Sequence, residues 1–237
     1  KIILTYMTDF TCNNLYQDHI ENIDHVIMPS KDYAEKCNSI SDKNLYLGSP
    51  KYDMVYNKDE IISKYNLDTE KSRLLVIAPR MRDIDNIDML HLYSLFKNLV
   101  WEIVVKSRGK DKIPDNLRGD KYYEDFSWWP HTSLELMYVS DLVMNFSSTC
   151  IKECIMLKKP VLNFDIKPFP ILLKHLYDYG YCKNFDDISK VNDDEIMSFV
   201  NNLDNNYMED EFNKAIENHL FTGNSSKRIL DFIMEKY

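Results

Sequence analysis

Short apolar runs alternate with segments that carry apolar residues at helical spacing through the middle of the chain. The run 73–79 is almost entirely apolar, as expected of a parallel strand buried on both faces, and 101–107, 141–146 and 160–166 are further strand-like runs. The segments 87–99 and 132–140 have helical periodicity instead, the second with Thr132 and Glu135 in a capping-box pattern. This alternation predicts an α/β protein with a doubly wound parallel sheet and helices on both faces.

The two ends of the chain differ from this middle part. Three strand-like runs precede it: 1–7, 24–30 and 44–50. The last of them ends in a Gly-Ser-Pro breaker, and after Phe169 the apolar spacing predicts a helical C-terminus. We therefore place a domain boundary after Gly48, which gives domains over 1–48 and 49–237. The first is too short for a whole doubly wound domain, so we expect the chain to begin inside it.

Composition and charge exclude several classes of function. With 237 residues, 44% of them hydrophobic, the chain is long enough to bury a large core. The net charge of −9 argues against broad binding to nucleic acid or anionic membranes, which needs a basic surface. No apolar run approaches the ~20 residues of a membrane helix, and the five scattered cysteines fit reduced thiols and no metal site. We expect a cytoplasmic protein without a metal ion.

The stretch SSTC, which follows the run 141–146, is the first candidate for a site. Ligands of open α/β sheets bind at the carboxyl ends of the strands, where helix N-termini also point. Ser147, Ser148 and Thr149 occupy that place, and their hydroxyl and backbone N–H groups could hold a phosphate. The alternative is that these residues only cap the helix behind them.

Glu153 lies four residues after Thr149, one residue too far for a capping box with that threonine. At about 100° per residue, Ile151, Cys154 and Ile155 form the core stripe of the helix, and Glu153 shares the opposite side with Thr149. A carboxylate one turn behind the hydroxyls has the spacing to bind a ribose diol while the elbow binds a phosphate. The alternative is a solvated glutamate on an exposed face.

Basic residues follow two of the predicted strands. Arg80 comes directly after the first apolar run, and Lys106 and Arg108 come at the end of the second. Because the carboxyl ends of parallel strands share one edge of a sheet, these side chains and Ser147 could converge on a diphosphate. Taken singly, each is an ordinary surface charge.

Residues 139–164, VSDLVMNFSSTCIKECIMLKKPVLNF, resemble the donor-nucleotide motif of GT-B glycosyltransferases. The resemblance is closest to the UDP-N-acetylglucosamine 2-epimerase superfamily and the CDP-glycerol glycerophosphotransferase-like enzymes. On that pattern Ser147 matches the phosphate-contacting serine and Glu153 matches the ribose-binding glutamate. Ser148 and Thr149 replace two glycines of the epimerase motif.

Other segments agree with this resemblance. LGSPKYD (47–53) resembles the connection between the two domains of these families, and FTGNSSKRILDFI (221–233) resembles the tail of the epimerases. Arg80 and Lys106 match basic positions of the families, although the histidines that accompany those positions are absent.

The sequence SWWPH is the candidate for recognition of the nucleotide base. Trp128, Pro130 and His131 lie where related enzymes hold the base, and aromatic side chains can stack on a uracil or cytosine. The alternative is an aromatic plug buried under a loop.

The resemblance implies a GT-B-type fold in which 1–48 ends an acceptor-side Rossmann-like domain and 49–237 forms the nucleotide-sugar-binding one. It implies a glycosyltransferase that takes a nucleotide-diphosphate sugar, UDP- or CDP-linked, and transfers the sugar to a glycan or polymer acceptor. No cofactor or obligatory metal is implied, and a second copy or a partner subunit is an expected partner. A UDP-N-acetylglucosamine 2-epimerase and a non-catalytic donor-binding subunit or scaffold are the alternatives. We name no catalytic residue, because in the family the general base usually comes from the N-terminal domain.

Overall fold

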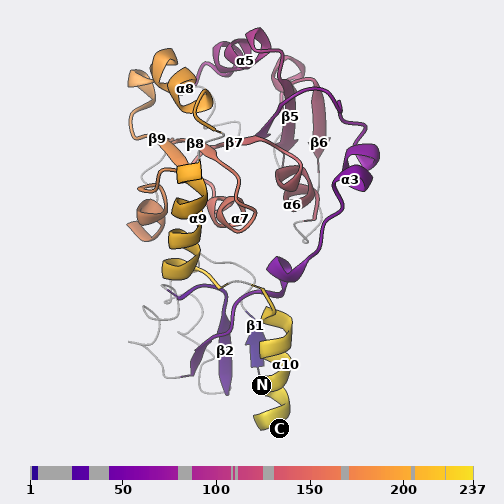
Figure 1. The fold of residues 1–237 in the computed structure, drawn as a ribbon, viewed down its shortest axis with the longest axis vertical. Coiled ribbons are helices and arrows are strands. Elements are labelled where there is room, and N and C mark those ends of the chain that lie inside the picture. Colours follow the sequence, from indigo (N-terminus) through magenta and orange to yellow (C-terminus); the bar gives the residue numbers. More distant parts are fainter. Residues whose placement is uncertain are drawn as a thin grey trace. The chain divides into compact units, whose positions relative to one another are not determined.

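Six short strands between residues 73 and 185 form one parallel sheet in the computed structural model (Figure 1). They are β4 (Arg73–Ile77), β5 (Glu102–Ser107), β6 (Lys121–Glu124), β7 (Leu142–Asn145), β8 (Val161–Phe164) and β9 (Cys182–Phe185). Their order is β6-β5-β4-β7-β8-β9, and every neighbouring pair is parallel. The chain starts at the centre with β4, moves outward to β6, and then crosses to β7 and continues to β9. The predicted doubly wound parallel sheet is confirmed.

The structure describes ten ranges of the chain: 2–4, 23–31, 43–79, 87–107, 109, 112–124, 131–166, 171–203, 206–221 and 223–236. The chain divides into two compact units. One is Tyr56–Phe212, and the other combines Lys1–Val55 with Asn213–Tyr237. The domains expected over 1–48 and 49–237 stay a prediction.

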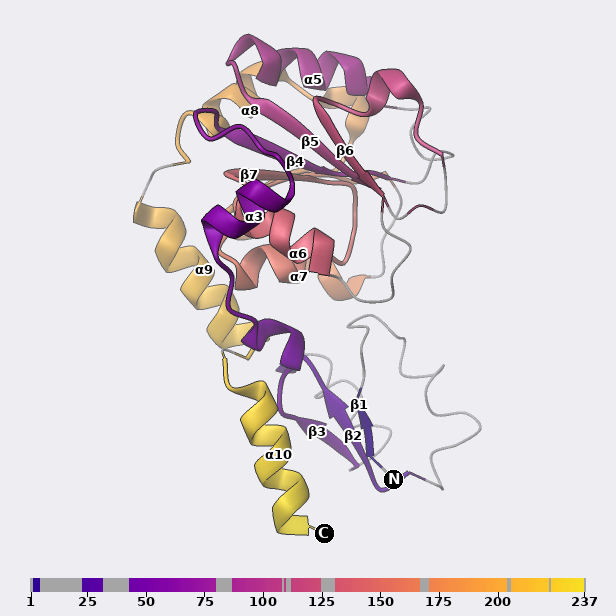
Figure 2. The same ribbon diagram turned by 90° about the vertical axis from the view of Figure 1, so that its right-hand side faces the viewer.

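Helices cover both faces of the six-stranded sheet (Figure 2). On one face lie α5 (Met89–Asn98) and α8 (Asp193–Val200), whose apolar side chains join the strands in the main core. On the other face lie α6 (His131–Tyr138) and α7 (Ile151–Met156). The remaining helices described between Tyr56 and His219 are α3 (Lys58–Lys64), η3 (Asp115–Leu117), η4 (Ile171–Leu176), η5 (Ile188–Lys190) and α9 (Asn206–His219). Within the described ranges, no helix has the length and hydropathy that crossing a membrane requires.

Two details of the sequence analysis differ from the structure. The strand β9 was missed, because its side chains are mostly half-buried and its sequence lacks an apolar run. The capping box of α6 is wrong: the helix begins at His131, which places Thr132 inside it. Glu135 instead accepts hydrogen bonds from Lys64 Nζ, at 2.7 and 3.0 Å, and from the hydroxyl of Tyr65. The carboxylate of Glu135 is thus bound by the last residue of α3 and by the residue that follows it, and it does not cap α6.

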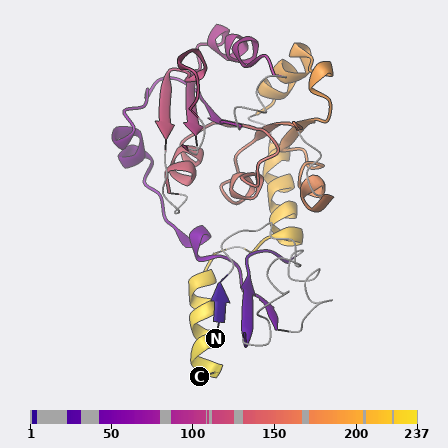
Figure 3. The same ribbon diagram turned by 180° about the vertical axis from the view of Figure 1, so that it is seen from behind.

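The other unit contains a parallel sheet of order β1-β2-β3. Its elements are β1 (Ile2–Leu4), β2 (His25–Met28), β3 (Asn44–Tyr46), η2 (Pro50–Asp53) and α10 (Ser225–Lys236). The C-terminal helix α10 lies beside these strands, as Figure 3 shows from behind. The ring of Phe232 on α10 meets that of His25 on β2 edge-on, with centroids 5.0 Å apart.

The start of α10 packs closely against the segment that follows β3. Gly48 has a φ of +88°, and an added Cβ would lie 2.4 Å from Ser225 Oγ, so both the backbone angle and the space require glycine. The guanidinium of Arg228 lies 3.8 Å from the ring centroid of Phe221, and its Nε donates to the carbonyl of Leu47 at 3.3 Å. The two segments that the family resemblance singled out at 47–53 and 221–233 therefore lie together.

Candidate functional site

The strand order of the large sheet contains a topological switch point between β4 and β7. Connections leave β4 toward β5 on one side, whereas β7 begins the other half of the sheet. In open α/β sheets this reversal opens a crevice at the carboxyl ends of the two strands, and ligands bind there. The connection after β4 contains no glycine between residues 78 and 88, so it lacks the glycine-rich dinucleotide fingerprint. The elbow after β7 follows the carboxyl end of one of these two strands.

Ser147 turns the chain at this elbow in a left-handed conformation, with a φ of 47°. Its backbone N–H donates to Asn163 Oδ1 at 3.1 Å, and its hydroxyl donates to Asp165 Oδ1 at 2.9 Å. The residue is 1% exposed. Because a hydroxyl has one proton, the Ser147 hydroxyl can face a ligand only as an acceptor. Direct donation from this side chain to a phosphate is therefore not what the geometry favours, and its phosphate role stays a prediction.

Ser148 and Thr149 leave donors open at the elbow. The two consecutive backbone N–H groups, and the hydroxyl of Thr149, donate to no acceptor in the part of the chain that the structure describes. Both residues are half-buried. The carbonyl of Ser148 is held by the side-chain amide of Asn145 at 3.2 Å, which orients the peptide. Successive N–H groups beside a left-handed residue form a concavity that suits an anion.

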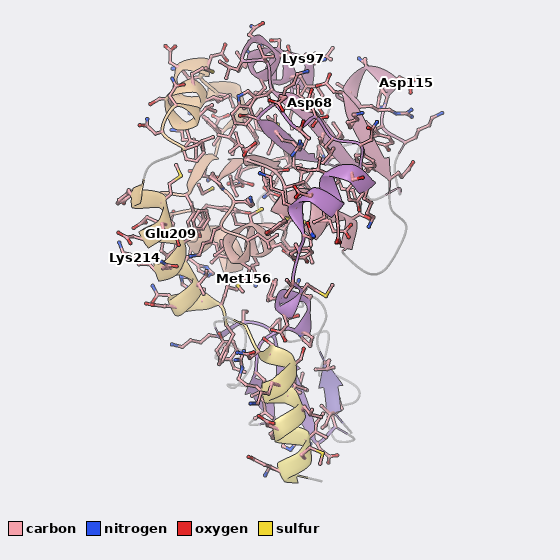
Figure 4. All side chains as sticks on the ribbon, turned by 45° about the vertical axis from the view of Figure 1, so that its right-hand side comes forward. Asp68, Lys97, Asp115, Met156, Glu209 and Lys214 are labelled. Atoms are coloured by element: carbon pink, nitrogen blue, oxygen red, sulfur yellow. The ribbon has the colours of Figure 1, made fainter. Side chains whose placement is uncertain are left out.

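The helix behind the elbow buries Glu153. It is α7, which ends at Met156, labelled in Figure 4. The predicted core stripe of Ile151, Cys154 and Ile155 is confirmed, since all three are 0% exposed. Glu153 is only 9% exposed, so the alternative of a solvated glutamate on an open face is wrong. Burying a carboxylate costs free energy unless the group is paired or hydrogen-bonded.

The elbow also acts in part as a helix cap. Ser148 Oγ accepts a long hydrogen bond of 3.4 Å from the N–H of Cys150, the residue at the N-cap position of α7. The side chain of Cys150 makes no cap hydrogen bond. Capping therefore uses one hydroxyl of the three and does not account for the whole polar stretch.

The other predicted site residues are placed only in part. Lys106, at the carboxyl end of β5, is 6% exposed, and its Nζ donates to the carbonyl of Ser107 at 2.6 Å. The register pairs Lys106 with Ile77 of β4, next to the switch point. Four predicted residues lie outside the described ranges: Arg80, Arg108, Trp128 and Pro130. His131 opens α6, but its side chain is likewise not described. All of these roles stay predictions.

One feature of the site was missed by the sequence analysis. The tripeptides Asn-Phe-Ser at 145–147 and Asn-Phe-Asp at 163–165 and 184–186 end three neighbouring strands. On one face, Asn145 Nδ2 donates to Asn163 Oδ1 at 2.8 Å, and Asn163 Nδ2 donates to Asn184 Oδ1 at 2.6 Å. We call these three residues the asparagine ladder. The recurrence of Asn-Phe at each strand end was the signal that could have revealed it.

Stacked phenylalanines occupy the opposite face of the same strand ends. The rings of Phe146 and Phe164 have centroids 5.4 Å apart, and those of Phe164 and Phe185 are 5.1 Å apart. All three belong to the main core. The carboxyl ends of β7, β8 and β9 are thus joined by amide hydrogen bonds on one side and by ring stacking on the other, which gives the elbow a rigid base.

No protein-family profile matches the chain, and no curated protein matches it. Solved structures do match. The wall teichoic acid polymerase TagF superposes with a TM-score of 0.65 at 17% sequence identity, over 98% of this chain and 63% of that one. A TagF variant soaked with CDPG gives 0.67 at 19% identity, over 98% and 62%. The UDP-GlcNAc 2-epimerase of Neisseria meningitidis bound to UDP-GlcNAc gives 0.59 at 19% identity, over 90% and 62%.

This likeness establishes the fold. The chain has the GT-B fold of glycosyltransferases and UDP-GlcNAc 2-epimerases, as its resemblance to those families implied. The chain spans less than two thirds of the length of these structures. The structural neighbours are enzymes, a polymerase and an epimerase.

Proposed function

We propose that this GT-B chain binds the nucleotide diphosphate of an activated donor at the elbow after β7 and serves a transferase that passes the donor's sugar to a glycan or polymer acceptor. The observation that carries the proposal is the pair of open N–H groups of Ser148 and Thr149 beside the switch point. Open donors at this position of a doubly wound sheet are the usual means of holding a phosphate.

Each group of the elbow has a part in this proposal. The N–H groups of Ser148 and Thr149 hold a phosphate oxygen, and the Thr149 hydroxyl donates to a second one. Glu153, one turn later, accepts hydrogen bonds from the ribose diol. Lys106 supplies a positive charge at the end of β5, next to the crevice. The two N–H groups, the Thr149 hydroxyl and Lys106 stabilise the negative charge that develops on the leaving diphosphate when the donor bond breaks, and Glu153 holds the ribose in place.

Two donor classes are in question. The similarity to a TagF structure soaked with CDPG supports a CDP-linked donor, whereas the similarity to an epimerase bound to UDP-GlcNAc supports a UDP-linked one. The epimerase reaction is the second candidate function for that reason. The proposed phosphate and ribose contacts are common to both donor classes. The two classes differ in the nucleotide base, cytosine or uracil, so recognition of the base would distinguish them.

Calorimetric titration of the full chain with UDP, CDP, GDP and ADP tests the proposal. We expect one nucleotide to bind, and the Glu153→Ala variant to lose about ten- to a hundredfold in affinity, the range for hydrogen bonds to a charged group. Glu217→Ala is the matched control, because Glu217 is an exposed helical glutamate of α9. Circular dichroism of both variants checks that they are folded.

The outcomes separate clearly. Binding that survives in Glu217→Ala and is lost in Glu153→Ala supports the assignment. Absence of binding for all four nucleotides, or equal binding by the Glu153→Ala variant, overturns it. Where UDP binds, incubation with UDP-GlcNAc followed by NMR of the sugar C2 position tests the epimerase alternative.

A further inference from the structure

We propose that Asp165 and Asn163 are positioning residues that hold Ser147 in its left-handed conformation and thereby aim the N–H groups of Ser148 and Thr149 at the ligand. This inference rests on the proposed function for the identity of the ligand. It assigns a role to Asn163, which lies in β8, and to Asp165, which directly follows that strand.

Ser147 has a strained backbone conformation. Its φ of 47° lies in the left-handed region that residues other than glycine rarely adopt, so the conformation is strained. Strained residues persist only where the surroundings hold them. Here the backbone N–H of Ser147 is held by Asn163 and its hydroxyl by Asp165, at 3.1 and 2.9 Å. The strain at the elbow is therefore offset by β8.

Asn163 and Asp165, which hold Ser147, are hydrogen-bonded to each other. Asn163 Nδ2 donates to Asp165 Oδ1 at 3.1 Å, the same oxygen that accepts from the Ser147 hydroxyl. Asn163 Oδ1 accepts from both the N–H of Ser147 and Asn145 Nδ2. Asn163 is 0% exposed, so these bonds are not exchanged for water. The hydrogen bonds leave the elbow little freedom to rotate.

The hydrogen bond between Asn163 and Asp165 has a counterpart at the end of β9, where no described residue of the elbow contacts it. Asn184 Nδ2 donates to Asp186 Oδ1 at the end of β9, as Asn163 Nδ2 donates to Asp165. Asp186 is exposed, and among its described contacts there is none with a residue of the elbow. The two aspartates share sequence context and strand position but differ in their contact with Ser147. Asp186 is therefore a matched control for Asp165.

Nucleotide affinity of three variants tests the role of Asp165, using the nucleotide that binds the wild type. We expect Asp165→Ala to weaken binding about five- to tenfold, because the Ser147 hydroxyl and Asn163 Nδ2 both lose the acceptor that orders the site. Asp165→Asn should restore affinity to within about twofold, because its Oδ1 can accept both hydrogen bonds. Asp186→Ala should leave affinity unchanged. Asp165 is mutated in preference to Asn163, because loss of Asn163 would also break the asparagine ladder.

A second variant separates positioning from general stabilisation. Glycine adopts a φ of +47° without strain, so in a Ser147→Gly background the Asp165→Ala change should alter affinity less than about twofold. A role limited to overall stability would give the same loss in both backgrounds, and that result overturns the proposal. Equal affinity losses for Asp165→Ala and Asp186→Ala would overturn it as well.

Amide hydrogen exchange by NMR gives a readout that needs no nucleotide. In the wild type the amide of Ser147 should be protected, and those of Ser148 and Thr149 should exchange quickly. Asp165→Ala should lower the protection of Ser147 selectively, and an unchanged protection overturns the positioning role. If the wild type binds none of the nucleotides while this protection depends on Asp165, the proposed function fails and the inference loses its ligand, but the elbow remains held as described.

Discussion

The carboxylate of Asp53 caps a helix that begins 172 residues later in the chain. Its Oδ1 accepts from the backbone N–H of Ser225 at 2.9 Å, and its Oδ2 accepts from that of Ser226 at 2.6 Å. Both are first-turn residues of α10, whose N–H groups have no partner within the helix. A side chain that reaches a distant helix in this way fixes the helix to η2 and supplies a negative charge at its positive end.

Replacing Asp53 should destabilise the unit that contains α10. Burial opposes ionisation of Asp53, but the hydrogen bonds from Ser226 and Ser225 and the charge of Arg228 outweigh it and lower its pKa below 3.8. We expect Asp53→Ala to reduce the free energy of unfolding at pH 7 by about 1–2 kcal/mol, the cost of losing a cap. Urea denaturation followed by circular dichroism measures it.

The sign of the pH dependence follows from that lowered pKa. A carboxyl group whose pKa is lower in the folded state adds stability above its unfolded pKa and loses it as the pH falls through the folded pKa. The difference between the wild type and Asp53→Ala should therefore be full at pH 6–7 and shrink below about pH 4. Asp231→Ala, an exposed position of α10, serves as the control. A difference that is the same at pH 3 and pH 7 would contradict the ionic cap.

Arg73 and Glu102 form a buried ion pair at the amino ends of β4 and β5. Their Nε and Oε2 atoms are 2.8 Å apart, and both side chains are 4% exposed. The guanidinium also donates to the carbonyls of Val139 and Asp68, at 2.7 and 2.6 Å. We expect Arg73→Met to lower the free energy of unfolding by about 3–5 kcal/mol, because it leaves a buried carboxylate without its counter-charge. Chemical denaturation at pH 7 is the measurement.

A double mutant and a surface control make that test specific. The Arg73→Met/Glu102→Leu variant should be less destabilised than the sum of the two single variants, since no isolated charge remains. Lys97, labelled with Asp68 in Figure 4, pairs with Asp120 at 3.5 Å on the surface. Lys97→Met should cost less than about 1 kcal/mol. Additive losses in the double variant would refute the interpretation.

His91 of α5 and Asp193 of α8 form an exposed pair, with Nε2 and Oδ1 2.9 Å apart. The hydrogen bond to Asp193, and then the charge of that carboxylate, raise the pKa of His91 above 6.5. An NMR titration of the imidazole should therefore give a midpoint above 6.5 in the wild type and a lower one in Asp193→Asn. Asp194→Asn, the exposed neighbour, should leave it unchanged.

The raised pKa of His91 also determines how the contribution of this pair to folding stability changes with pH. A histidine whose folded pKa is raised adds stability that is fully present below its unfolded pKa and is lost as the pH rises through the folded value. The stability difference between the wild type and Asp193→Asn should thus be larger at pH 6 than at pH 8.5. A midpoint that is the same in wild type and Asp193→Asn would show that the two groups do not interact in solution.

The sheet was readable from the sequence where its strands are buried on both faces. β4, β5, β7 and β8 are fully buried and have apolar residues at their centres, and the elbow could be located because parallel strands place their carboxyl ends at one edge. β9 lies at the edge of the sheet, and its half-buried residues leave no apolar run to detect. The apolar pattern of a sequence reveals a strand only where its residues are buried, and most residues of β9 are only half-buried.

The inner contacts of the site could not be read in the same way. Nothing near Ser147 indicates that its hydroxyl turns inward, because the acceptor, Asp165, lies 18 residues later on another strand. The capping box predicted for Glu135 failed for a similar reason, since Lys64 and Tyr65 come from 70 or more residues away. Hydrogen bonds between side chains depend on which elements become neighbours, and the strand order β4-β7-β8 decides that.

The cap that Asp53 forms on α10 has a consequence for the order in which the protein folds during synthesis. A ribosome that synthesises the chain delivers Asp53 long before Ser225, and at ~5–20 residues per second the interval is of the order of ten seconds or more. The unit Tyr56–Phe212 has all of its strands by then. Residues 1–55 precede Tyr56–Phe212 in the chain, but they belong to a unit whose other part, 213–237, is translated after it.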